Sequence, residues 1–157
     1  DSGVKDIAGD LRKAADPKQF GLDAIKDATG DLARVSLHAA GLEGEQFVQI
    51  CGEDPVTLGY RAMGGTGCIS VTSNVAPAEM ARMHKACDEN DMATAREIEK
   101  RFIALHKALF CTPSPGPAKY ALSKLGLCSD ETRLPIVGPD AAAKTRIEAA
   151  MERAGLI

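Results

Sequence analysis

The chain has 157 residues, of which 45% are hydrophobic and 26% charged, with a formal net charge of −3. This length is enough for one domain with a sizeable core, and the small net charge gives no sign of a nucleic-acid or membrane surface. No apolar run approaches the ~20 residues of a membrane span and no signal-peptide pattern opens the chain, so we expect a cytoplasmic protein.

The predicted elements begin with a helix over residues 7–15 and a short, buried apolar strand over residues 21–26, which carries Lys26. Strand side chains alternate, so Lys26 shares a face with Leu22 and Ala24. An apolar site disfavours the ammonium and lowers the pKa of a lysine toward ~7–8, at which a neutral amine can form a Schiff base with a carbonyl. The alternative is a structural lysine whose head group reaches water at the strand end.

A second lysine stands in a similar segment near the start of the chain. Val4 to Leu11 matches Ile25 to Leu32 at five of eight positions, and Lys5 occupies the place of Lys26. Lys5 follows Asp1, Ser2 and Gly3 and has no apolar strand around it. We therefore interpret Lys5 as a surface residue.

Strands and helices then alternate. Thr29 or Asp31 can cap a helix to about Ala40, whose apolar stripe is Leu32, Val35, Ala39 and Leu42. A second strand is predicted over residues 46–51, a short helix opens near Pro55, the glycines of 64–67 end it, and a third strand is predicted over 68–72. The short connections favour parallel neighbours, which is α/β architecture.

The rest of the chain is predicted to be helical. Helices are expected from Pro77 to about Asp88, from Asp91 to Phe110, from Pro117 to Gly126 and from Asp140 to Ala154, with a loop over 134–139. We divide the chain accordingly into an α/β part (1–76) and a helical part (77–157).

Candidate sites are expected at the carboxyl ends of the strands, where ligands of parallel α/β folds bind. Gly52 ends the second strand, and its missing side chain would let a small acid approach the backbone. The glycines of 64–67 precede a strand, so they fail the context test for a phosphate loop, and Ser70 and Ser73 lack the histidine and elbow of a serine hydrolase. The ionisable group left in the apolar layer is Lys26.

Metal and disulfide chemistry have little support in the sequence. The five cysteines are odd in number and form no CxxC pair, which favours reduced thiols. The histidines have no HxxxH or HExxH spacing, so we expect no metal site. These residues are Cys51, Cys68, Cys87, Cys111 and Cys128, and His38, His84 and His106.

Three segments resemble a known family. Ile25 to Leu32 (IKDATGDL) closely resembles the Schiff-base lysine segment of the dihydrodipicolinate synthases, which are class I pyruvate aldolases. Residues 64–76 (GGTGCISVTSNVA) are similar to that family's GGxGxISVTxNVA stretch, and residues 114–127 are similar to its NPxPxK…LGL segment. The three agree in order and spacing.

The resemblance implies the C-terminal part of a (β/α)8 barrel, about three parallel strands with their helices, followed by a helical C-terminal region. It implies condensation of pyruvate with L-aspartate 4-semialdehyde to give 4-hydroxy-tetrahydrodipicolinate in lysine biosynthesis. Lys26 would form the imine, Ile69 would wall the pyruvate methyl group, and Gly52 would leave room beside it. No cofactor is implied beyond that covalent imine, and the implied partners are the N-terminal half of the barrel and further copies in a homotetramer.

The resemblance covers only the family's second half. The threonines and tyrosine that relay protons in the family belong to the other half, and Asp1 stands near the place of its semialdehyde-binding arginine. We therefore expect one part of a longer polypeptide that is active only with the other half. The alternatives are another pyruvate-dependent aldolase of the N-acetylneuraminate lyase superfamily, and a non-catalytic half-barrel that binds a partner through its open edges.

Overall fold

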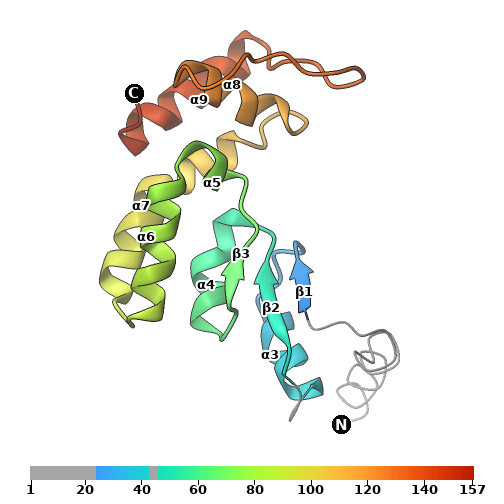
Figure 1. Cartoon of the computed structure of the whole chain (residues 1–157), viewed down its shortest axis with the longest axis vertical. Helices are drawn as coiled ribbons and strands as arrows, with labels where there is room; N and C mark the ends of the chain where they lie inside the picture. The colour runs from blue at the N-terminus through green and yellow to red at the C-terminus, as the bar shows by residue number, and fades with distance from the viewer. Residues whose placement is uncertain (1–23, 43–45) are drawn as a thin grey trace. The chain divides into compact units, whose positions relative to one another are not determined.

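The computed structural model describes residues 24–42 and 46–157, so the predicted helix over 7–15 and Lys5 lie outside the described residues. The chain divides into two compact units, residues 1–69 and residues 70–157. The division falls before the predicted boundary at residues 76 and 77. Figure 1 shows the strands of the first unit and the helices of the second.

The first unit contains a three-stranded parallel sheet in the order β1-β2-β3. Its strands are β1 (Ala24–Asp27), β2 (Val48–Cys51) and β3 (Gly67–Cys68). Between them lie α3 (Ala33–Gly41), the 3-10 turn η1 (Asp54–Val56) and α4 (Thr57–Ala62). In this region the predicted order of strand and helix is confirmed, and Pro55 stands in the first turn of η1, where its missing N–H costs nothing.

One face of the sheet is packed against α3 and α4. Asp27, Cys51 and Cys68 stand opposite one another in the three strands and point to this face. Cys51 is fully buried with Val35 of α3 and Tyr60 of α4. Tyr60 in turn lies so close to Gly65 that a Cβ there would stand 2.1 Å from its ring, which explains a glycine after α4.

The opposite face of the sheet is open among the described residues. Ala24 and Lys26 of β1 are exposed, Val48 is 41% exposed and Ile69 is 54% exposed. The prediction that Lys26 lies on a buried strand is therefore wrong for this structure, because an apolar strand pattern does not say which of its faces another layer covers.

The predicted third strand is too long. β3 ends at Cys68, and Thr72 opens the short helix α5 (Thr72–Val75). Ser73 N donates to Ser70 Oγ at 2.8 Å, and Asn74 Nδ2 donates to Val71 O at 3.0 Å. These local side-chain bonds replace strand pairing with a turn, which the β-branched run in the sequence conceals.

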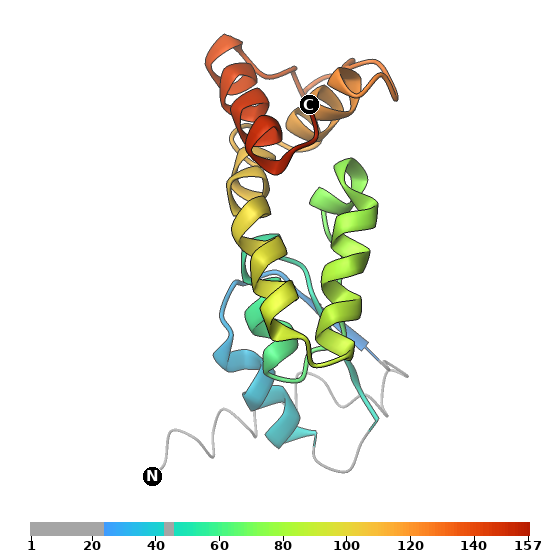
Figure 2. The ribbon, with the colours of Figure 1, turned by 90° about the vertical axis from the view of Figure 1, so that its left-hand side faces the viewer.

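The second unit is helical. After α5 come α6 (Pro77–Asp88), α7 (Met92–Ala108), α8 (Gly116–Lys124) and α9 (Ala141–Ala154). α6 and α7 run side by side, and α9 packs on both α7 and α8 (Figure 2). The predicted helix ends are confirmed within a few residues: Asp91 accepts from Thr94 N, Asp140 accepts from Ala143 N, and Gly155 ends α9 with φ of 73°.

An apolar core joins these helices. The predicted buried face of α7 is confirmed, since Ile98, Phe102, Leu105 and Leu109 are at most 1% exposed. One polar contact crosses this core: the Thr72 hydroxyl lies 2.7 Å from His106 Nδ1, and both residues are buried. A hydrogen bond in so apolar a setting ties α5 to α7 in a single arrangement.

Candidate functional site

Lys26 lies near the carboxyl end of β1, on the open face of the sheet. Its Cα partner in β2 is Ile50, and Ile50 is in turn opposite Gly67 of β3. The lysine stem extends past its own row, over Gly52. A Cβ built on Gly52 would stand 2.6 Å from Lys26 Cε and 3.1 Å from Lys26 Cγ. The lysine arm thus crosses from the end of β1 to the end of β2.

Gly52 and Ile69 are the residues that directly follow β2 and β3, and they lie on the same side of the sheet as Lys26. Gly52 N donates to Asp27 O at 2.7 Å, and Ile69 N donates to Cys51 O at 2.8 Å. Because strand side chains alternate, Gly52 and Ile69 face the side of Lys26, opposite to the cysteines between them. The structure therefore brings all three predicted site residues to one edge and one face of the first unit.

The open face is chemically simple. Its described residues are small or apolar apart from the single ionisable side chain of Lys26. They are Ala24, Lys26, Ala28, Val48, Ile50, Gly52, Gly67 and Ile69. A primary amine on an otherwise apolar sheet edge can act as a nucleophile toward a carbonyl when it is unprotonated. The described part of this face holds no acid or base beside it.

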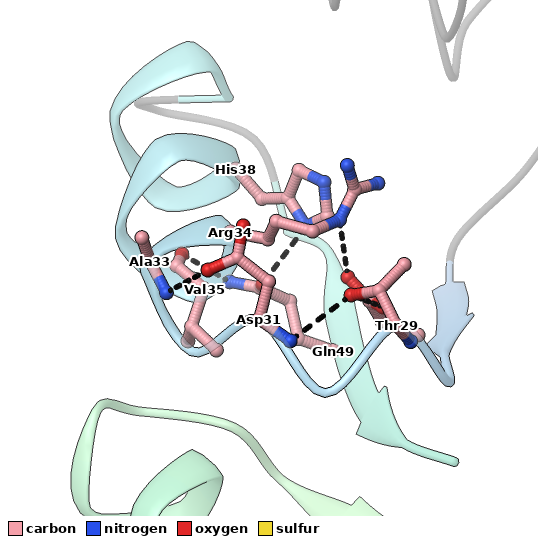
Figure 3. A network of polar contacts seen from close by, with 8 residues as sticks. Thr29, Asp31, Ala33, Arg34, Val35, His38 and Gln49 are labelled. Atoms are coloured by element: carbon pink, nitrogen blue, oxygen red, sulfur yellow. Dashed lines mark hydrogen bonds and ion pairs between the residues drawn. The ribbon is translucent and has the colours of Figure 1, made fainter. Parts of the chain in front are cut away.

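The turn after Lys26 is held by Asp27, whose side chain points to the opposite, buried face. Asp27 Oδ1 accepts from Thr29 N at 2.9 Å and from Thr29 Oγ1 at 2.6 Å, and Asp27 Oδ2 accepts from Arg34 Nε at 2.6 Å. Figure 3 shows Arg34 reaching from α3 toward the turn that carries Thr29. These hydrogen bonds give the Asp-Ala-Thr-Gly-Asp segment after the lysine a structural role, because its first carboxylate fixes the turn.

Electrostatics agree with that role. Burial alone would raise the pKa of Asp27, but the bonds from Thr29 and the Arg34 guanidinium outweigh it, and the net pKa of Asp27 is lowered. The carboxylate is therefore charged at neutral pH and holds its three donors. The backbone position of Lys26, one residue earlier, is fixed by the same bonds.

A polar contact that the sequence analysis did not predict joins Gln49 of β2 to α3. Gln49 Nε2 donates to Val35 O at 3.2 Å, and Gln49 Oε1 lies 3.2 Å from His38 Nδ1 (Figure 3). His38 and Gln49 are buried, whereas Ala39 of the predicted apolar stripe is exposed. A polar residue in the middle of an apolar strand was the available signal for such a contact.

Two further expectations concern sites elsewhere. Among residues 24–42 and 46–157 no group of three or more His, Cys, Asp or Glu side chains could hold a metal ion. In the same described ranges no helix is long and apolar enough to cross a membrane.

The sheet defines a class of protein in which parallel strands alternate with helices, as in (β/α) barrels, whose ligands bind at the carboxyl ends of the strands. The sequence model of the dihydrodipicolinate synthetase family matches residues 18–154, and the chain belongs to this family.

Individual relatives agree. Over 133 residues the chain is 62% identical to the 4-hydroxy-tetrahydrodipicolinate synthase of Hyphomonas neptunium, a match that covers 84% of this chain and 45% of that protein. The dihydrodipicolinate synthase structure from Thermotoga maritima superposes with a TM-score of 0.84 at 30% identity, covering 98% of this chain and 51% of that one. The chloride-inhibited dihydrodipicolinate synthase from Acinetobacter baumannii, complexed with pyruvate, gives a TM-score of 0.79 at 32% identity, with coverages of 85% and 45%.

These likenesses confirm the predicted fold class, the C-terminal part of a (β/α)8 barrel followed by a helical region. The chain spans about half the length of the relatives that it matches. The three strands of the described residues do not close a barrel, and one face of their sheet is open.

Proposed function

We propose that this chain is the lysine-bearing half of a 4-hydroxy-tetrahydrodipicolinate synthase, a lyase that condenses pyruvate with L-aspartate 4-semialdehyde. The observation that carries the proposal is the position of Lys26, whose stem lies over Gly52 at the carboxyl edge of the sheet. The 62% identity to a synthase and the pyruvate complex of a related enzyme support it.

In this mechanism the Lys26 amine attacks the keto carbon of pyruvate, and loss of water leaves an imine. The imine draws electrons from the neighbouring methyl group, which loses a proton to give an enamine. The enamine carbon then attacks the aldehyde carbon of the semialdehyde. The substrate's own amino group finally displaces Lys26 from the imine carbon, which closes the ring and frees the lysine.

The two other site residues shape this chemistry. Ile69, 54% exposed on the same face, would wall the methyl group of the bound pyruvate. Gly52 would leave room beside the substrate and, by lacking a side chain, also leaves room for the lysine arm itself. The covalent imine takes the place of a cofactor.

The proton transfers need groups from outside this face, because Lys26 is its one ionisable side chain in the described ranges. We therefore propose that the remaining barrel strands supply them and cover the open face. We further propose a homotetramer in the cytoplasm, acting in the biosynthesis of lysine.

The test is reductive trapping with pyruvate and borohydride in the complete enzyme, in which this chain is joined by the other half of the barrel. Trypsin cuts after Lys26, so alkylation of Lys26 should convert the separate peptides 19–26 and 27–34 into one modified peptide, 19–34. Lys26→Arg should abolish the label. Labelling confined to Lys5, or no labelling, would contradict the proposal and would favour a non-catalytic half-barrel.

The aldehyde is tested separately. Turnover of pyruvate with L-aspartate 4-semialdehyde, and none with N-acetylmannosamine, is the expected result. The reverse preference would place the chain among the N-acetylneuraminate lyases while leaving the Lys26 imine intact.

A further inference from the structure

Two cysteines lie side by side on the helix-covered face of the sheet, opposite to the face that carries the proposed site. Cys51 of β2 and Cys68 of β3 are Cα partners in neighbouring parallel strands, so both side chains point to the helix-covered face. Adjacent strands lie about 4.8 Å apart, and a disulfide spans Cα separations of about 4.4–6.8 Å. The two sulfurs are therefore within bonding reach once the strands draw the two Cβ atoms together, from about the strand spacing to the roughly 3.5–4.5 Å of a disulfide.

The surroundings of the pair favour one thiolate. Glu53 N donates to Cys51 Sγ at 3.4 Å, and Thr57 Oγ1 donates to Cys68 Sγ at 3.2 Å. A hydrogen bond from the Cys68 thiol lowers the pKa of Cys51, against its burial, and the same bond together with burial raises the pKa of Cys68. Asp54, a buried neighbour, opposes ionisation of both. Cys51 is therefore the more readily ionised of the two thiols, and in its thiol form it donates to Glu53 O at 3.2 Å.

Access to the pair is restricted but present. Cys51 is fully buried, whereas Cys68 is half-buried. A reagent from water therefore meets Cys68 first, and the full burial of Cys51 favours a small oxidant. Hydrogen peroxide fits this requirement, and thiolates are the form of cysteine that it oxidises.

We propose that Cys51 and Cys68 are a redox-sensitive dithiol that hydrogen peroxide converts into a disulfide. The Cys51 thiolate attacks one peroxide oxygen, so that an S–O bond forms, the O–O bond breaks, and the other oxygen leaves as water after taking up a proton. Cys68 sulfur then attacks the resulting sulfenic acid: the S–S bond forms, the S–O bond breaks, and the hydroxide leaves as water with the proton of the Cys68 thiol. In total two thiols and one peroxide give one disulfide and two waters.

The position of the pair gives the disulfide a consequence. Cys51 immediately precedes Gly52, and Cys68 immediately precedes Ile69, so the bond would displace the two residues that flank Lys26. Oxidation would therefore suppress imine formation, and a thiol reductant would restore it. This consequence rests on the proposed function, whereas formation of the disulfide does not.

Peptide mapping tests the bond itself. Trypsin places the two cysteines in separate peptides, 35–61 and 62–82, each with a single cysteine. After peroxide treatment and digestion without reductant, the two peptides are expected as one linked species, which reductant separates. The linked species should be lost in Cys51→Ser and in Cys68→Ser, and the second variant should instead accumulate a Cys51 sulfenic acid, detected by mass as one added oxygen in peptide 35–61.

The exposed Cys128 is the matched control for delivery of the oxidant. Oxidation at Cys128 while peptides 35–61 and 62–82 stay unlinked would overturn the proposal. So would linkage of either peptide to one that carries Cys87 or Cys111 in preference to its predicted partner.

Borohydride trapping of pyruvate then separates the two proposals. Loss of trapping in oxidised wild type, but not in peroxide-treated Cys68→Ser, is the expected result. Linked peptides with unchanged trapping would overturn the regulatory consequence. Absence of trapping in the untreated protein would instead overturn the proposed function and leave the disulfide standing.

Discussion

Gly52→Ala is the substitution that most directly tests whether the lysine arm depends on the space over β2. The new Cβ would stand 2.6 Å from Lys26 Cε and 2.8 Å from Ala28 Cβ. Carbon atoms in contact prefer about 3.5–4.0 Å. The flexible lysine can move away, but Ala28 Cβ is fixed to the backbone, so the loop after β1 must shift by roughly 1 Å as well.

The expected magnitudes follow from that displacement. Overpacking of this kind costs about 1–3 kcal/mol of stability. A misplacement of 1 Å at a reacting group costs on the order of 10²-fold in rate. We therefore expect pyruvate trapping at Lys26 to slow by about that factor, while the protein stays folded.

The assay is the rate of borohydride-trapped peptide 19–34, read beside a thermal melt. Gly41→Ala is the control, because a Cβ there would meet no atom within 4 Å. It should trap pyruvate at the wild-type rate. If Gly52→Ala also trapped at that rate, the inference that Gly52 makes room for the lysine would be refuted.

Two further predictions concern stability. Asp27→Asn removes the charge that holds Arg34 and should lower the free energy of unfolding in urea by about 1–3 kcal/mol at neutral pH. Because the pKa of Asp27 is lowered in the folded state, its contribution to stability is present above the ordinary value of 3.8 and is lost as pH falls through the folded-state pKa. The difference in stability between wild type and variant should therefore shrink in acid. An undiminished difference in acid would show that the carboxylate charge is not the cause. Asp140→Ala removes the 2.8 Å bond to Ala143 N and should cost about 0.5–2 kcal/mol, whereas Asp140→Ser, which keeps an acceptor, should recover most of the loss in the same unfolding experiment.

Local chemistry made the helical unit predictable. Pro77, Asp91 and Asp140 mark helix starts by bonds or constraints within a few residues, and each stands where the sequence predicted a start. The predicted length of the third strand was wrong, and the cause is also local: Ser70 and Ser73 form hydrogen bonds with each other, and the strand ends at Cys68. A β-branched run read alone overstated its length.

The sequence by itself determined the order of strands and helices, the lysine at the end of the first strand, and the family to which its motifs point. Only the tertiary structure decided that the face of Lys26 is open, that its stem covers Gly52, that His38 meets Gln49 below the sheet, and that Cys51 stands opposite Cys68. The physical reason is register: hydrogen bonds between strands distant in the chain set which residues are neighbours, and no local pattern encodes them.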